Sequence, residues 1–114
     1  MDIEEFRKHA HSMVDWMADY LKNVEDYPVL SNSKPGEVKA KLPLKFPEHP
    51  EDFTEIFKDF EEKIMPGITH WESPNFFAYF PASKSKPSIL GEMLMSVLGT
   101  QGMIWLTSPA ATEL

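Results

Sequence analysis

Four histidines are the side chains best suited to acid–base or metal chemistry, and their spacing does not bring them together. His9 and His11 fall on the polar side of the first predicted helix, His49 lies among prolines, and His70 precedes Trp71. No His-Glu-x-x-His or similar metal-binding grouping occurs among them. No serine, histidine and aspartate are spaced as a nucleophilic triad. We therefore expect no catalytic residue and no metal site in this chain.

The lysines and carboxylates also give no sign of a reactive centre. A lysine that forms a Schiff base needs a desolvated site that lowers its pKa. Lys84 and Lys86, the only lysines near the aromatic segment, lie in a Ser-Lys-Ser-Lys loop that is expected to be exposed. The acidic residues of 51–62 lie opposite an apolar stripe, which is typical of a solvated helix face. The sequence thus predicts residues that line a pocket but no catalytic group.

The pocket-lining residues are expected in the segment 69–83, where five aromatic rings occur within ten residues. Pro74 and Pro81 exclude a helix through this segment, because each lacks an N–H and restricts the residue before it. We expect a stiff, extended aromatic segment that offers apolar faces to a planar ligand or a partner chain. The alternative, which composition alone favours, is that the rings fill a core. They are Trp71, Phe76, Phe77, Tyr79 and Phe80.

A long amphipathic helix is predicted from residue 2 to about residue 24. Its apolar residues recur at three- and four-residue steps, and Asp2 with Glu5 resembles a capping box. Trp16 and Tyr20 widen the apolar face. A face this broad needs a cover, which is either another subunit or the rest of its own domain. The stripe contains Phe6, Ala10, Met13, Val14, Met17, Leu21 and Val24.

Two more helices are predicted, at about residues 51–65 and from a Ser85 cap to about residue 98. Pro50 is placed in the first turn of the former and Pro66-Gly67 at its end. Residues 103–106 are expected to be extended or a strand. A further helix is predicted to start after Ser108. Because it has only about two turns, we expect the chain to be the front end of a longer protein.

Composition excludes several classes of partner and site. The net charge of −7 argues against nucleic acid and against an anionic membrane surface. No apolar run reaches the ~20 residues of a membrane helix, and the first residues do not form a secretion signal. The 114 residues include no cysteine, which excludes disulfides and is compatible with a cytoplasmic location.

Five motifs together resemble the group II pyridoxal-phosphate-dependent amino acid decarboxylases, most closely their aromatic-L-amino-acid branch. The resemblance is collinear over essentially all 114 residues and corresponds to the first part of a longer family member. The motifs are Phe6-Arg7 with the helix that follows, Pro66 to Trp71, Ser73 to Pro81, Leu90 to Leu94, and Ser108 to Leu114.

The resemblance implies a mainly α segment of three amphipathic helices and an aromatic stretch, belonging to a fold-type I, aspartate-aminotransferase-like enzyme. Residues 1–84 would form an N-terminal helical segment that lies across the other subunit of a homodimer. Residues 85–114 would begin the larger cofactor-binding domain. This would account for the broad apolar face of the first helix.

The resemblance also implies roles for individual residues. Substrate-lining positions would be Trp71, Tyr79, Phe80, Pro81, Ala82, Gln101 and Met103. Ala82 and Ser83 would face cofactor. Ala82 stands where relatives usually carry a threonine, so one hydroxyl is missing. Met103 stands where many relatives carry an aromatic ring, and its sulfur can still pack on a substrate ring.

The implied reaction removes the α-carboxylate of an aromatic L-amino acid, with pyridoxal 5'-phosphate as electron sink. The lysine that holds the cofactor would lie beyond Leu114, so these 114 residues alone are expected to be inactive. One alternative is a non-catalytic helical module that only dimerises or binds a partner. Another is a relative that oxidises its amino acid to an aldehyde.

Overall fold

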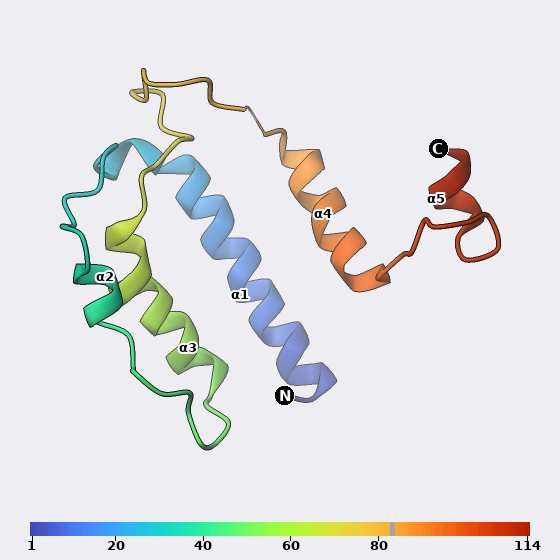
Figure 1. Cartoon of the computed structure of the whole chain (residues 1–114), viewed down its shortest axis with the longest axis horizontal. Coiled ribbons are helices and arrows are strands. Elements are labelled where there is room, and N and C mark those ends of the chain that lie inside the picture. The colour runs from blue at the N-terminus through green and yellow to red at the C-terminus, as the bar shows by residue number, and fades with distance from the viewer. Residues whose placement is uncertain (83) are drawn as a thin grey trace. The chain divides into compact units, whose positions relative to one another are not determined.

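The computed structural model describes residues 1–82 and 84–114, and all regular secondary structure within them is helical (Figure 1). The mainly α prediction is therefore confirmed. The chain divides into two compact units, residues 1–81 and 82–114. The helices are α1 (Ile3–Lys22), α2 (Glu37–Ala40), α3 (Phe53–Asp59), α4 (Lys86–Leu98) and α5 (Pro109–Glu113).

Helix α1 starts where its capping residues predict. The Asp2 carboxylate accepts the backbone N–H groups of Glu4 and Glu5, and the Glu5 carboxylate accepts the N–H of Asp2 at 2.8 Å. These bonds satisfy N–H groups that the first turn of a helix leaves without partners. The predicted capping box is confirmed.

Helices α1 and α3 lie side by side and run in the same direction (Figure 1). Aromatic rings fill the space between them. The His9 ring lies 4.8 Å from that of Phe53, and the Trp16 ring lies 5.7 Å from Phe57 and 5.5 Å from Phe60. Aromatic pairs at these distances stabilise the fold by more than the burial of their apolar surface alone.

The second predicted helix is shorter and less regular than expected. The Asp52 carboxylate accepts the N–H of Thr54 at 2.7 Å, so the helix begins at Phe53 and leaves Pro50 outside it. After Asp59 the chain widens into a π-helical turn, Phe60–Ile64, followed by a 3₁₀ turn, Met65–Gly67. The prediction of one α-helix over 51–65 is wrong, because periodicity does not distinguish an α-helix from its wider or tighter forms.

The connector between α1 and α3 is fixed to the end of the second helical segment. The hydroxyls of Ser31 and Ser33 both donate to the carbonyl of Pro66, at 2.7 and 3.3 Å. Val38 of α2 lies directly over Gly67, where an added Cβ would come within 2.5 Å of a Val38 methyl group. A glycine is needed there for close packing.

The second unit contains the two predicted capping serines. Ser85 accepts the N–H of Ser88 at the start of α4, and Ser108 accepts that of Ala111 at the start of α5. Helix α4 ends at Gly99, whose φ of 58° suits glycine. Residues 104–107 form a turn in which the Thr107 N–H donates to the Ile104 carbonyl, so the prediction that residues 103–106 are extended or a strand is wrong.

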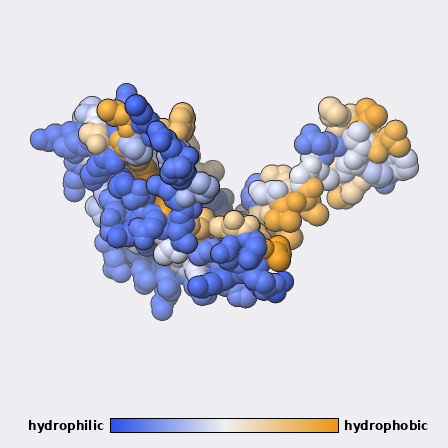
Figure 2. Space-filling view, turned by 90° about the horizontal axis from the view of Figure 1, so that it is seen from below, coloured by the Kyte–Doolittle hydropathy of each residue, from blue (hydrophilic) through white to orange (hydrophobic). Residues whose placement is uncertain are grey.

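Few apolar side chains are buried in either unit. Among the described residues only Val24 and Met65 form a buried apolar core. In Figure 2 hydrophobic side chains are concentrated on the surface of the part that contains α4 and α5, whereas the visible face of the other part is mainly hydrophilic. No helix in the described ranges has the length and apolar character required to cross a bilayer.

Candidate functional site

The aromatic segment begins at His70, which is held by two tyrosines. The His70 ring lies 5.6 Å from the Tyr20 ring of α1 and 4.8 Å from the ring of Tyr27. The Tyr20 hydroxyl and His70 Nδ1 are hydrogen-bonded at 2.7 Å, and the His70 N–H donates to the Val29 carbonyl. Only 2% of His70 is exposed. The residue therefore fixes the start of the segment to α1 and to the connector.

Burial changes the ionisation of both partners. Desolvation lowers the pKa of His70, because a charged imidazolium is disfavoured there. The pKa of Tyr20 is raised first by burial and then by the negative charges of Glu72 and Tyr27. Both effects favour a neutral pair at neutral pH. The hydrogen bond of this neutral pair fixes the start of the aromatic segment to α1.

Residues 70–76 fold into consecutive turns. The Ser73 N–H donates to the His70 carbonyl, and the Phe76 N–H donates to the Ser73 carbonyl, both at 3.0 Å. The Ser73 hydroxyl accepts the N–H of Asn75, and Ser73 is buried. The prediction of an extended segment is wrong here. Ser73 provides the hydrogen bonds of these turns. The Ser73-Pro74 pair is the sequence feature that favours a turn here, and the aromatic residues around it do not indicate one.

These turns bring three rings into one stack, with Trp71 as the shared member. The Trp71 centroid lies 4.7 Å from that of Phe76 and 5.6 Å from that of Tyr79, with interplanar angles of 26° and 14°. We call Phe76, Trp71 and Tyr79 the ring stack. Of the predicted substrate-lining residues, the structure brings Trp71 and Tyr79 into direct contact.

Tyr79 of the ring stack and Phe80 after it present their side chains outward. Tyr79 is 81% exposed and Phe80 is 98% exposed. Tyr79 has a φ of 56°, the only positive φ at a non-glycine residue in the described chain. The left-handed region disfavours residues with a Cβ, so an exposed tyrosine in it indicates a constrained segment. Side chains this exposed are available to a ligand or to another polypeptide.

The other predicted site residues are distributed over both units. Pro81 ends the first unit, and Ala82 begins the second and is exposed. The prediction for Ser83 falls outside the described residues. Gln101 and Met103 lie in the loop after α4, where the Gln101 carbonyl accepts the Thr107 hydroxyl at 2.8 Å and Met103 is exposed.

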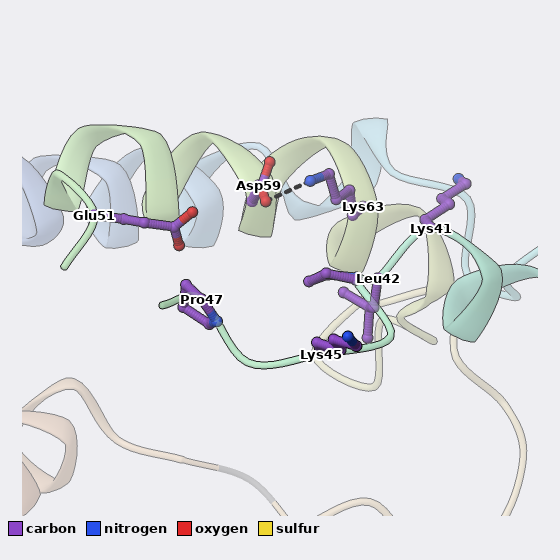
Figure 3. A pocket seen from close by; sticks show the side chains of 8 residues that line it. Lys41, Leu42, Lys45, Pro47, Glu51, Asp59 and Lys63 are labelled. Atoms are coloured by element: carbon purple, nitrogen blue, oxygen red, sulfur yellow. Dashed lines mark hydrogen bonds and ion pairs between the residues drawn. The ribbon is translucent and has the colours of Figure 1, made fainter. Parts of the chain in front are cut away.

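An open, polar cavity of about 440 Å³ lies apart from the ring stack (Figure 3). The connector supplies residues on one side and α3 with its π-helical continuation supplies the other. Within it Asp59 and Lys63 form an ion pair, so part of its charge is already neutralised. It includes none of the predicted site residues. Its lining consists of Lys41, Leu42, Pro43, Lys45, Pro47, Glu51, Asp59 and Lys63.

A smaller apolar cavity of about 190 Å³ lies beside the His70 anchor. Tyr27 and His70 form one side, and Met65 and Ile68 contribute apolar surface. Glu61 also borders it, and its carboxylate accepts the Trp16 indole N–H at 2.8 Å. Glu61 and His70 are thus each hydrogen-bonded to a residue of α1, Trp16 and Tyr20 respectively.

None of the described lysines fits the role of a cofactor anchor. Lys63 is partly covered but paired with Asp59, and the other lysines are exposed. An exposed ammonium keeps its proton at neutral pH and is a poor nucleophile. Ala82 has only backbone atoms to offer a phosphate. The described histidine, aspartate and glutamate side chains form no cluster that could bind a metal ion.

Sequence reasoning missed two features of this site, the His70 anchor and the role of Phe76. The four-residue spacing of Trp16 and Tyr20 by itself predicts only a wider apolar helix face. Their rings stack in parallel at 5.5 Å, and Tyr20 extends from there to His70. A tyrosine hydroxyl on an apolar helix face indicates that a hydrogen-bonding side chain lies nearby, because a buried hydroxyl requires a partner.

The pyridoxal-dependent decarboxylase conserved domain matches residues 35–114. A tryptophan decarboxylase of Camptotheca acuminata is 54% identical over 114 residues, which are 100% of this chain and 23% of that protein. A phenylacetaldehyde synthase of Arabidopsis thaliana is 52% identical, again over 100% of this chain and 23% of the relative.

The same similarity extends to three-dimensional structure. The crystal structure of Catharanthus roseus tryptophan decarboxylase in complex with L-tryptophan matches with a TM-score of 0.92 and 52% identity. The match covers 99% of this chain and 24% of that one. The chain thus spans about a quarter of the length of the relatives that it matches.

Proposed function

The chain belongs to the pyridoxal-dependent decarboxylase family, and on that basis we propose that it is the N-terminal part of an aromatic L-amino acid decarboxylase. The observation that carries the proposal is the family match over residues 35–114. The ring stack supports an aromatic substrate, since stacked rings bind planar side chains through large contact areas. In the reaction the bond to the α-carboxylate breaks, carbon dioxide leaves and a proton takes its place.

The proposed role of these residues is to bind and orient the substrate, not to perform the bond cleavage. Trp71, Tyr79, Phe80 and Pro81 would line the side-chain pocket and exclude water from it. Gln101 and Met103 would reach the active site of the other subunit of a homodimer. The enzyme would act in the cytoplasm. Residues 1–84 would supply the dimer contacts and 85–114 the start of the cofactor-binding domain. The catalytic lysine would belong to the rest of the enzyme.

The experiment uses the complete protein that contains these residues, purified with pyridoxal 5'-phosphate. It is incubated separately with tryptophan, tyrosine, phenylalanine, DOPA and histidine, and amine and carbon dioxide are measured. We expect equal amounts of both from at least one aromatic substrate, and loss of activity when the cofactor is removed. No carbon dioxide from any of them would favour the non-catalytic dimerisation module.

A matched pair of variants tests the proposed pocket. Phe80 and Phe46 are equally exposed, at 98% and 96%, but only Phe80 lies in the aromatic segment. We expect Phe80→Ala to raise KM about tenfold or more, the range that burial of a phenylalanine by substrate allows. Phe46→Ala should leave KM unchanged. An equal effect of the two variants would contradict the pocket assignment.

The aldehyde synthase is a second candidate, because a similar relative carries that name. Such an enzyme consumes one molecule of oxygen and one of water for each amino acid. It releases aldehyde, carbon dioxide, ammonia and hydrogen peroxide. Aldehyde and peroxide in place of amine in the same assay would identify this reaction.

A further inference from the structure

The ring stack contains one residue with no assigned role, Phe76. Its ring lies nearer to Trp71 than the Tyr79 ring does, at 4.7 Å against 5.6 Å. Phe76 is partly covered, whereas Trp71 and Tyr79 are exposed. The covered ring therefore supports the two rings that are available to a ligand.

The backbone holds Phe76 in this supporting position. Its N–H donates to the carbonyl of Ser73, whose own N–H donates to the carbonyl of the buried His70. The His70 ring is in turn fixed by Tyr20 and Tyr27. A continuous series of contacts thus leads from α1 to the Phe76 ring.

Tyr79, in contrast, is largely exposed. Its φ of 56° is disfavoured for a residue with a side chain, so contacts must hold it there. Its ring contact is with Trp71, at an angle of 14°. A change in the orientation of the Trp71 ring would therefore be transmitted to Tyr79.

We propose that Phe76 is a positioning residue that sets the orientation of Trp71, and through it Tyr79, for the aromatic ring of the substrate. The inference rests on the proposed function, because it assumes that these rings line the substrate pocket. A flat ring at position 76 is required, since only a planar surface can align the indole by stacking.

The complete enzyme is compared in four variants. Phe76→Leu and Phe76→Met remove the planar ring but keep apolar volume, and Phe76→Tyr keeps the ring. Phe53→Leu is the matched control, because it removes a stacked ring that lies between α1 and α3. For each variant KM, kcat, melting temperature and the near-ultraviolet circular dichroism of tryptophan are measured.

We expect Phe76→Leu and Phe76→Met to raise KM about two- to tenfold, the range of one aromatic pair, with kcat within about twofold. The tryptophan dichroism should change, and Phe76→Tyr should restore both properties. Phe53→Leu should lower the melting temperature without altering KM. The methionine variant also provides a second test if the leucine variant does not fold.

Two results would overturn the inference while the proposed function stands. One is an active enzyme in which both non-aromatic variants keep the wild-type KM and dichroism. The other is a KM change that Phe53→Leu reproduces, which would reflect general loss of stability. Absence of turnover by the unsubstituted enzyme would instead overturn the proposed function itself.

Discussion

At the scale of single residues, the buried His70 carries the clearest physical consequence. It is the largest fully buried side chain in the described residues, and its nearest ring partners are Tyr20 and Tyr27. Burial stabilises the neutral imidazole relative to the charged form. The anchor of the aromatic segment therefore depends on pH.

We predict that the complete enzyme loses stability as the pH falls below the ordinary histidine value of about 6.5. The pKa of His70 is lowered in the folded state, so the unfolded state binds the proton more readily. The stabilisation is therefore present above this pH and is lost as pH falls towards the folded pKa. Glu61 and Glu72 are the carboxylates near this histidine and its tyrosine partner.

Thermal melting between pH 7.5 and 5.5 measures this effect. In His70→Asn the amide oxygen can accept the Tyr20 hydroxyl, but the side chain does not titrate. The variant should lose less stability over this range than the wild type. Parallel curves for the two proteins would show that His70 is not the responsible group.

At the scale of elements, the starts of α1, α4 and α5 were predictable from sequence, whereas the start of α3 and the irregular segments were not. The caps at Asp2, Ser85 and Ser108 depend on short-range hydrogen bonds, which local sequence specifies. The π-helical turn after Asp59 and the turns after His70 are also closed by hydrogen bonds between nearby residues. These segments follow neither the α-helical nor the strand period, so the spacing of apolar residues does not predict them. The fold class and the identity of the aromatic segment followed from sequence, whereas its shape and the contribution of Phe76 did not.

The packing of α2 on the end of the second helical segment gives a prediction at this scale. Gly67→Ala should destabilise the complete enzyme by about 1–3 kcal/mol, the usual cost of overpacking. Its Cβ would lie 2.5 Å from a methyl group of Val38, and the stiff β-branched side chain cannot turn away freely.

A double-mutant cycle with chemical denaturation tests this contact. In a Val38→Ala background the same glycine substitution should cost much less, because the clashing methyl group is gone. An identical cost in both backgrounds would mean that backbone conformation, and not Val38, requires the glycine.

At the scale of the whole molecule, many large hydrophobic side chains are exposed. In the second unit they include Leu90, Leu94, Val97 and Leu98 of α4, and Met103, Ile104, Trp105 and Leu106 of the loop after it. Contiguous exposed apolar side chains of this kind mark a surface that binds another polypeptide segment.

We therefore predict that the 114 residues alone do not unfold cooperatively. The two buried apolar side chains, Val24 and Met65, cannot offset the conformational entropy of ordering the chain. Isolated residues 1–114 should show a broad thermal transition by circular dichroism and bind a hydrophobic dye, whereas the complete enzyme should do neither. A sharp transition of a compact monomer would contradict this.

The parallel arrangement of α1 and α3 has a consequence for biosynthesis. The contacts of α1 with Glu61 and His70 join residues 45 and 50 positions apart. A ribosome that adds about 5–20 residues per second needs on the order of 2–10 s to deliver those partners after α1 has been made. During that interval the nascent helix lacks the partners that contact Trp16 and Tyr20 in the folded chain, so we expect chaperones that bind exposed aromatic side chains during translation to recognise it.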